Sequence, residues 1–265
     1  NIIPDPFYGT NESKVQWVEN EDWEYQTFFQ IKNKFLKHDF ITLHFEGLDT
    51  YADVYLNDSL ILQSENMFVA HQIDVKQVLL RDVNKLYIRF YSPVKKAKAD
   101  QQNYIAQLPG EERVFVRKAQ YQFGWDWGPR LVTSGIWKNV YLKAEDHLKV
   151  TQSKINFIDH GSDTVLVNID LLMLALDKTD YKIEFSELNS KTVLYSEAFE
   201  NHFATTQQMS VPFLVKERWL PNGFGKQTLY RFKLTIISKN KIIYENIITT
   251  GFSNIKLIQE KDQYG

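Results

Sequence analysis

The stretch YQFGWDWGPR at positions 121–130 contains one aspartate between two tryptophans, Trp125-Asp126-Trp127. An indole offers a flat apolar surface and a carboxylate accepts hydrogen bonds, so the three side chains together suit a ring-shaped polar molecule. Glycines on both sides and a following proline indicate a shaped loop. The triplet is therefore a candidate binding site.

A second interpretation of the same residues is structural. In a plain strand over 123–127, both indoles face one side, where they pack into a core, and Asp126 faces solvent. Spacing alone favours this burial of the tryptophans, because large apolar side chains usually lie inside. Arg117 and Arg130 could pair with the aspartate, but we expect surface charges at both positions.

Composition excludes several other classes of site. The 31 basic and 33 acidic residues are mixed along the chain, so no basic surface is expected for nucleic acid. P-loop, GxGxxG and HExxH motifs are missing, and the six histidines lack ligand spacing, so neither a metal nor a cofactor is expected. No apolar run reaches the roughly 20 residues that a membrane span needs. The opening NIIPDPFYG, without Met or a signal-peptide pattern, predicts a processed or trimmed piece.

The elements that must position the triplet are mostly strands. Short runs with period-two alternation predict half-buried strands of a sandwich at 23–29, 40–45, 52–56 and 85–90. Ser92-Pro93 supplies an N-cap and a first-turn proline for a helix over 94–107. The aromatic-rich composition is typical of such sheets.

The pattern changes beyond the polar stretch at 143–149. Strand signals then recur about every ten residues with no helix between them, at 164–174, 181–185, 192–196, 208–213, 229–237 and 241–249. Six or seven short strands of this kind predict an immunoglobulin-like sandwich without its disulfide, because the chain has no cysteine. The fold class predicted from these patterns is all-β, with two β domains in tandem.

Residues 117–142, RKAQYQFGWDWGPRLVTSGIWKNVYL, resemble the glycoside hydrolase family that contains β-galactosidases, β-glucuronidases and β-mannosidases. Within this stretch, Trp-Asp-Trp-Gly-Pro is similar to the β-mannosidase branch. Further segments agree in the family's order, at 3–25, 45–58, 65–75, 218–236 and 250–260, so the resemblance covers nearly the whole chain.

The resemblance implies a domain order. It predicts a jelly-roll, galactose-binding-like domain over 1–146, an immunoglobulin-like domain over 147–258, and the start of a linker to a (β/α)₈ barrel over 259–265. In this family the two catalytic carboxylates of a retaining mechanism come from the barrel. We therefore expect no catalytic residue in this chain and no hydrolysis by it alone. Family members also carry a further segment before the equivalent of Ile3, which implies an unpaired sheet edge here.

The resemblance also assigns roles within the triplet. The family's loop reaches the barrel's pocket and holds the terminal sugar, so Asp126, Trp125 and Trp127 are predicted to bind substrate. The implied activity is exo-acting release of terminal β-D-mannose, and the implied partner is a β-mannoside held in a pocket shared with the barrel. For Asp126 and Trp125, the resemblance therefore favours a binding role over the structural role that spacing alone favours. For Trp127 both roles remain open, because one of the two indoles could anchor the loop.

Three other functions remain open at this stage. A free-standing carbohydrate-binding module, another glycosidase of the same family, and a structural pair of sandwiches in a surface protein all fit the strand pattern. Lys- and Asn-rich composition without cysteine favours a bacterial origin and a periplasmic or secreted location, with a lysosomal location for a eukaryotic parent.

Overall fold

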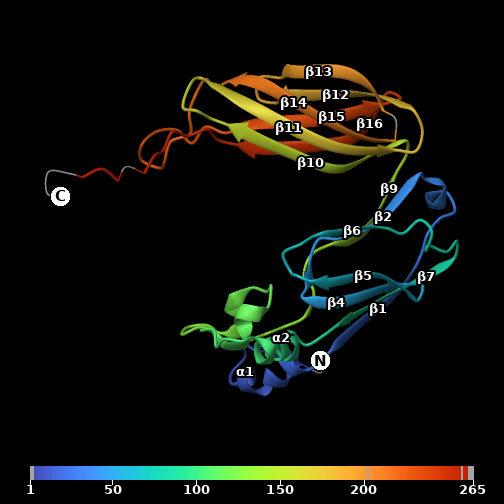
Figure 1. Cartoon of the computed structure of the whole chain (residues 1–265), viewed down its shortest axis with the longest axis vertical. Coiled ribbons are helices and arrows are strands. Elements are labelled where there is room, and N and C mark those ends of the chain that lie inside the picture. The colour runs from blue at the N-terminus through green and yellow to red at the C-terminus, as the bar shows by residue number, and fades with distance from the viewer. Residues whose placement is uncertain (1–2, 202, 258, 262–265) are drawn as a thin grey trace. The chain divides into compact units, whose positions relative to one another are not determined.

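The computed structural model describes residues 3–201, 203–257 and 259–261. The chain divides into two compact units, 1–144 and 145–265 (Figure 1). Residue 258 and most of the predicted linker, 262–265, lie outside the described residues. Among the residues described, no helix is long and apolar enough to cross a bilayer.

The first unit contains a four-stranded antiparallel sheet and a three-stranded sheet. The larger sheet has the order β1 (Trp23–Gln30), β7 (Val83–Phe90), β4 (Tyr51–Leu56), β5 (Ser59–Glu65). The smaller has the order β6 (His71–Asp74), β2 (Phe40–Phe45), β9 (Val140–Glu145). A short pair, β3 (Leu48–Asp49) and β8 (Gly135–Ile136), completes the strands.

The core of the first unit lies between these sheets. Strand β4 alternates, so that Val54 and its neighbours two residues away are buried while the residues between them are half-buried. Strand β2 is buried along its whole length. Residues from both sheets form one apolar cluster, which includes Ile41, Phe45, Ile88 and Phe90. The two sheets therefore form a sandwich.

Helices in the first unit are short and flank the sheets. The bounds are α1 (Asn11–Lys14), η1 (Gln16–Asn20), η2 (Phe35–Lys37), α2 (Pro93–Asn103), η3 (Glu111–Phe115) and η4 (Gln120–Phe123). Ser92 caps α2 by accepting a hydrogen bond from the Lys95 amide at 3.1 Å, as expected. The predicted end at residue 107 is wrong. Tyr104 is already extended, and Ile105 is fully exposed, so a longer helix would gain no apolar contact there.

The second unit is a seven-stranded antiparallel sandwich. One sheet has the order β10 (Leu148–Ile158), β11 (Thr164–Ala175), β14 (Ala204–Leu214). The other has the order β13 (Thr192–Asn201), β12 (Thr179–Glu187), β15 (Tyr230–Ser238), β16 (Lys241–Thr250). The prediction of two tandem β-sandwiches is confirmed, and β10 begins the second one before the first strand predicted there.

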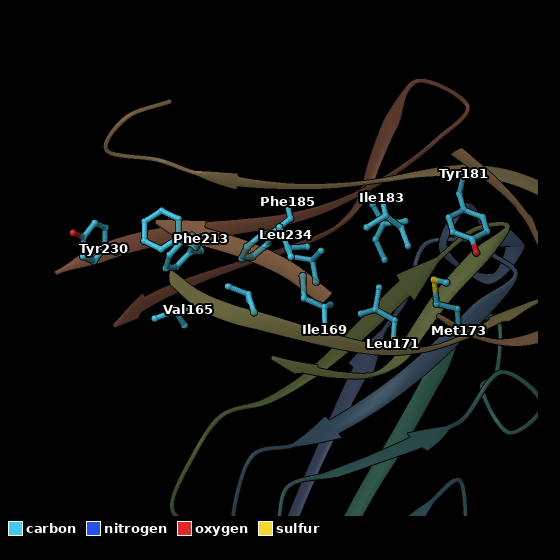
Figure 2. Packing of buried hydrophobic residues seen from close by; sticks show 14 of the residues in the cluster. Val165, Ile169, Leu171, Met173, Tyr181, Ile183, Phe185, Phe213, Tyr230 and Leu234 are labelled. Carbon is cyan, nitrogen blue, oxygen red and sulfur yellow. The ribbon is translucent and has the colours of Figure 1, made fainter. Parts of the chain in front are cut away.

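Side chains from the two sheets of the second unit interlock. Figure 2 shows Ile169 and Leu171 of β11 pointing toward Ile183 and Phe185 of β12. The Phe185 ring also stacks on Phe232, with ring centres 5.4 Å apart and planes 9° apart. The chain has no cysteine, so this core contains apolar and aromatic packing without the disulfide of a typical immunoglobulin core.

Candidate functional site

The triplet Trp125-Asp126-Trp127 forms the tip of a tight turn in the first unit. Two backbone hydrogen bonds close the turn, from Trp125 N to Gly128 O at 3.0 Å and from Gly128 N to Trp125 O at 3.1 Å. The side chains of Trp125 and Trp127 are 57% and 85% exposed, and Asp126 is exposed as well. The core-packing interpretation of the two indoles is therefore wrong, because a turn, unlike a strand, presents all three side chains to solvent.

The two indoles lie close to each other at this tip. Their ring centres are 5.9 Å apart with planes at 65°, which is an edge-to-face contact. Within the part of the chain that the structure describes, the Asp126 carboxylate has no hydrogen-bond or ion-pair partner. Two apolar surfaces and an unpaired acceptor thus face solvent together.

Arg130 holds the base of this loop. Its guanidinium donates to both carboxylate oxygens of Glu19, at 2.8 and 3.1 Å, and to Glu112 at 3.0 Å. It also lies over the Phe123 ring, 5.3 Å from the ring centre. The expectation of a free surface charge at Arg130 is wrong, because two carboxylates from distant segments converge on it. Arg117 is exposed, as expected.

Gly124 lets the chain turn tightly beside Arg130. Its φ is +89°, a left-handed conformation that suits glycine. A Cβ at this position would lie 3.2 Å from the Arg130 Cβ. Any side chain at Gly124 would therefore push against the arginine that holds the loop.

A network of hydrogen bonds around buried Lys118 and Asp49 links the residues before the turn, 118–122, to the residues after it, 131–133. Lys118 is fully buried, and its ammonium donates to the Asp49 carboxylate at 2.5 Å and to Thr133 O at 2.6 Å. Gln122 donates to the same Asp49 oxygen at 3.2 Å and accepts from Thr133. The Leu131 amide donates to Gln122 O at 2.9 Å. Residues before and after the turn are thus tied to strand β3.

The charged groups at the base of the loop, Arg130, Glu19 and Glu112, form ion pairs with one another. Burial acts to lower the pKa of Arg130, but its hydrogen bonds to Glu19 and Glu112 outweigh this and keep the pKa above its ordinary value. The arginine is thus engaged with these two acids and not with Asp126. Across the described ranges, no group of three or more His, Cys, Asp and Glu side chains is placed to hold a metal ion.

We expect the base of the loop to make stability depend on pH. Burial acts to raise the pKa of Glu112, but hydrogen bonds from its own backbone and from Arg130 outweigh it and leave the pKa below its ordinary value of 4.5. A depressed pKa stabilises the fold above the ordinary value and stops doing so as the pH falls through the folded-state value. The free energy of unfolding should therefore decrease from about pH 5 to pH 3.

Urea denaturation across this pH range measures the contribution of Glu112. The Glu112→Gln variant should be less stable at neutral pH and should lose less stability on acidification. Glu111→Gln, at the exposed neighbouring position, serves as the control and should follow the unmodified protein. A Glu112→Gln profile that runs parallel to the control would show that the Arg130 pair does not contribute.

The sequence patterns located the tip of the loop but did not predict the residues that hold it in place. Glu19 and Asp49 lie 111 and 73 residues before their partners Arg130 and Gln122 in sequence. Glu112 lies 18 residues before Arg130, and none of the three belongs to a recognisable motif. No local signal distinguished Lys118, which follows another basic residue, Arg117. Its burial depends on a strand that is remote in sequence.

Comparison with known proteins places this loop within a family. Residues 1–138 match the glycosyl hydrolase 2 galactose-binding domain-like family, and the chain belongs to that family. Beta-mannosidase B from Aspergillus terreus is 32% identical over 275 residues, covering 100% of this chain and 32% of the relative. Beta-mannosidase B from Aspergillus oryzae is 35% identical over 279 residues, covering 99% of this chain and 32% of the relative. The chain therefore spans about a third of the length of these relatives.

Solved structures agree with the sequence relatives. Beta-D-mannosidase from Dictyoglomus thermophilum superposes with a TM-score of 0.86 and 34% identity, covering 100% of this chain and 33% of that one. The exo-chitosanase CsxA from Amycolatopsis orientalis shares the fold, with a TM-score of 0.69, 15% identity, and coverage of 96% and 28%. Along its full length, this chain is homologous to the N-terminal third of β-mannosidases of the family.

Proposed function

We propose that this chain is the accessory region of an exo-acting, retaining β-mannosidase that removes terminal β-D-mannose from glycans or manno-oligosaccharides. In this proposal the bond-breaking carboxylates belong to a catalytic domain in the rest of the parent protein. The Trp125-Asp126-Trp127 tip forms one wall of the sugar pocket. Full-length similarity to a β-D-mannosidase at 34% identity supports the choice of parent.

The proposal depends most on one observation: Trp125, Asp126 and Trp127 are exposed at the tip of a turn whose base is held by Arg130. A pyranose presents an apolar C–H face and hydroxyl groups at its rim. An indole packs against the face, and the Asp126 carboxylate accepts hydrogen bonds from the hydroxyls. Because the turn is held by Arg130 and by the buried network, the backbone that carries these groups is positioned before the sugar binds. Their role is thus to position the sugar relative to groups on another domain.

Substrate preference tests this function directly. We expect the parent protein to hydrolyse p-nitrophenyl β-D-mannoside with a kcat/KM at least about 100-fold above that for the β-D-galactoside, β-D-glucuronide and β-D-glucosaminide, since a site that hydrogen-bonds hydroxyls rejects misplaced ones strongly. The 265-residue chain alone should hydrolyse none of them. Hydrolysis by the chain alone, or a parent that prefers another glycoside, would contradict the proposal.

A further inference from the structure

The larger sheet of the first unit has a polar outer face. In strand β4, Ala52 and Val54 point into the core, so Tyr51 and Asp53 point away from it. The strand register pairs Tyr51 with Glu65 and Asp53 with Gln63 on β5, which places these four side chains on the same outer face. None of them belongs to the Trp125-Asp126-Trp127 loop.

A cavity of about 500 Å³ lies over this face. Small-molecule sites typically measure about 300–1,000 Å³, so the cavity has the size of a binding site. It is lined largely by side chains that form hydrogen bonds, and those used below are Tyr51, Asp53, Gln63, Glu65, Tyr91 and Lys96.

The polar groups of the cavity are held in place before any ligand binds. The Asp53 carboxylate accepts from Gln63 Nε2 at 2.9 Å and from the Tyr91 hydroxyl at 2.6 Å. The bond to Asp53 raises the pKa of Tyr91 from its ordinary value of 10 to about 12, so the hydroxyl stays protonated well into the alkaline range. The Lys96 ammonium lies 5.1 Å from the centre of the Tyr91 ring. Lys96 is on helix α2, whose first turn is fixed by the Ser92 cap.

The hydrogen-bond donors and acceptors of these groups that remain unused suit hydroxyl groups better than ions. Glu65 and the remaining lone pairs of Asp53 accept hydrogen bonds, whereas Lys96 and the second N–H of Gln63 donate them. A hydroxyl both donates and accepts, so a polyhydroxylated ligand matches this mixture. An anion would face two carboxylates and a single ammonium group. The half-buried Tyr51 ring adds an apolar surface of the kind that packs against a sugar ring.

We propose that this cavity is a second carbohydrate site, which binds a neutral saccharide of one or two residues on the outer face of β4 and β5. The proposal goes beyond the function of the Trp125-Asp126-Trp127 loop and does not depend on it.

The test is an NMR titration of the ¹⁵N-labelled 265-residue chain with β-1,4-mannobiose. We expect progressive shifts of the amides at 51–53 and 63–65, with a dissociation constant in the millimolar range. Asp53→Asn should weaken binding by about tenfold, because it loses a charged acceptor and disturbs both bonds to Gln63 and Tyr91. Gln26→Ala is the matched control. Gln26 is exposed and pairs with Tyr87 on the same sheet face, away from the cavity.

Each result bears on the proposal. Asp126→Ala should leave the shifts at 51–53 and 63–65 unchanged, so failure of the loop's function and failure of this site are distinguishable. If Asp53→Asn perturbs the whole spectrum, Lys96→Gln at an exposed position provides the same test. Shifts confined to 124–128, no shifts, or shifts caused by inorganic phosphate and not by mannobiose would overturn the proposal.

Discussion

Replacing Asp126 with alanine is expected to lower the kcat/KM of the parent enzyme for p-nitrophenyl β-D-mannoside by about a hundredfold. The carboxylate is exposed at the tip of a fixed turn and has no partner within the described residues, so its free acceptor sites are available to the substrate. Loss of a charged hydrogen bond and of the sugar's orientation is enough for a decrease of about this size.

The same change should leave folding intact. Since Asp126 makes no contact that stabilises the described fold, the melting temperature of Asp126→Ala should equal that of the unmodified enzyme. Asp126→Asn keeps the shape and one acceptor, so we expect a smaller loss of kcat/KM than for alanine. Asp177→Ala, an exposed aspartate in a turn of the second unit, is the matched control. Kinetics that match this control would remove the loop from the proposed pocket.

Replacing Lys118 with methionine is expected to destabilise the first unit by about 3–5 kcal/mol. Lys118 is fully buried and Asp49 is 6% exposed, so removal of the ammonium leaves a carboxylate buried without its cation. Burial lowers the pKa of Lys118, and the neighbouring Asp49 carboxylate opposes this shift without cancelling it. Thr133 O would lose its Lys118 donor, and Gln122 would remain bonded to an Asp49 carboxylate that has lost its cation, so both ends of the loop would loosen.

Thermal unfolding followed by circular dichroism measures this effect. For a unit of this size the melting temperature should fall by roughly 10 °C. Lys32→Met, at an exposed position of the same unit, should change it little. Combining Lys118→Met with Asp49→Asn should recover part of the loss, because no unpaired charge then remains buried. A single variant as stable as the Lys32→Met control would show that the pair does not hold the loop.

Much of the fold could be predicted from local pattern. Alternation in 52–56 and in 164–174 indicated strands with one buried face, and β4 and β11 have that burial. The Ser92-Pro93 signal located the start of α2, because capping is a local interaction. The end of α2 could not be predicted in this way. It depends on whether residues beyond Asn103 find apolar neighbours, and Ile105 finds none.

The candidate site was only partly predictable. The family resemblance favoured exposure of Asp126 and Trp125, and both are exposed, whereas residue spacing by itself favoured burial of both indoles. Whether a tryptophan lies in a strand or on a turn depends on hydrogen bonds between Trp125 and Gly128, and alternation alone does not specify them. The role of the triplet in binding sugar stays a prediction.

The sequence by itself determined the all-β class, the two tandem sandwiches and the position of the triplet in the chain, because alternation, turn residues and motifs are encoded over short stretches. Only the tertiary structure decided what holds the triplet. Glu19 and Glu112 meet Arg130, and Lys118 meets Asp49, across separations of 18 to 111 residues. Such pairings follow from strand order and from the energetic need to match each buried charge with an opposite one, which no local pattern encodes.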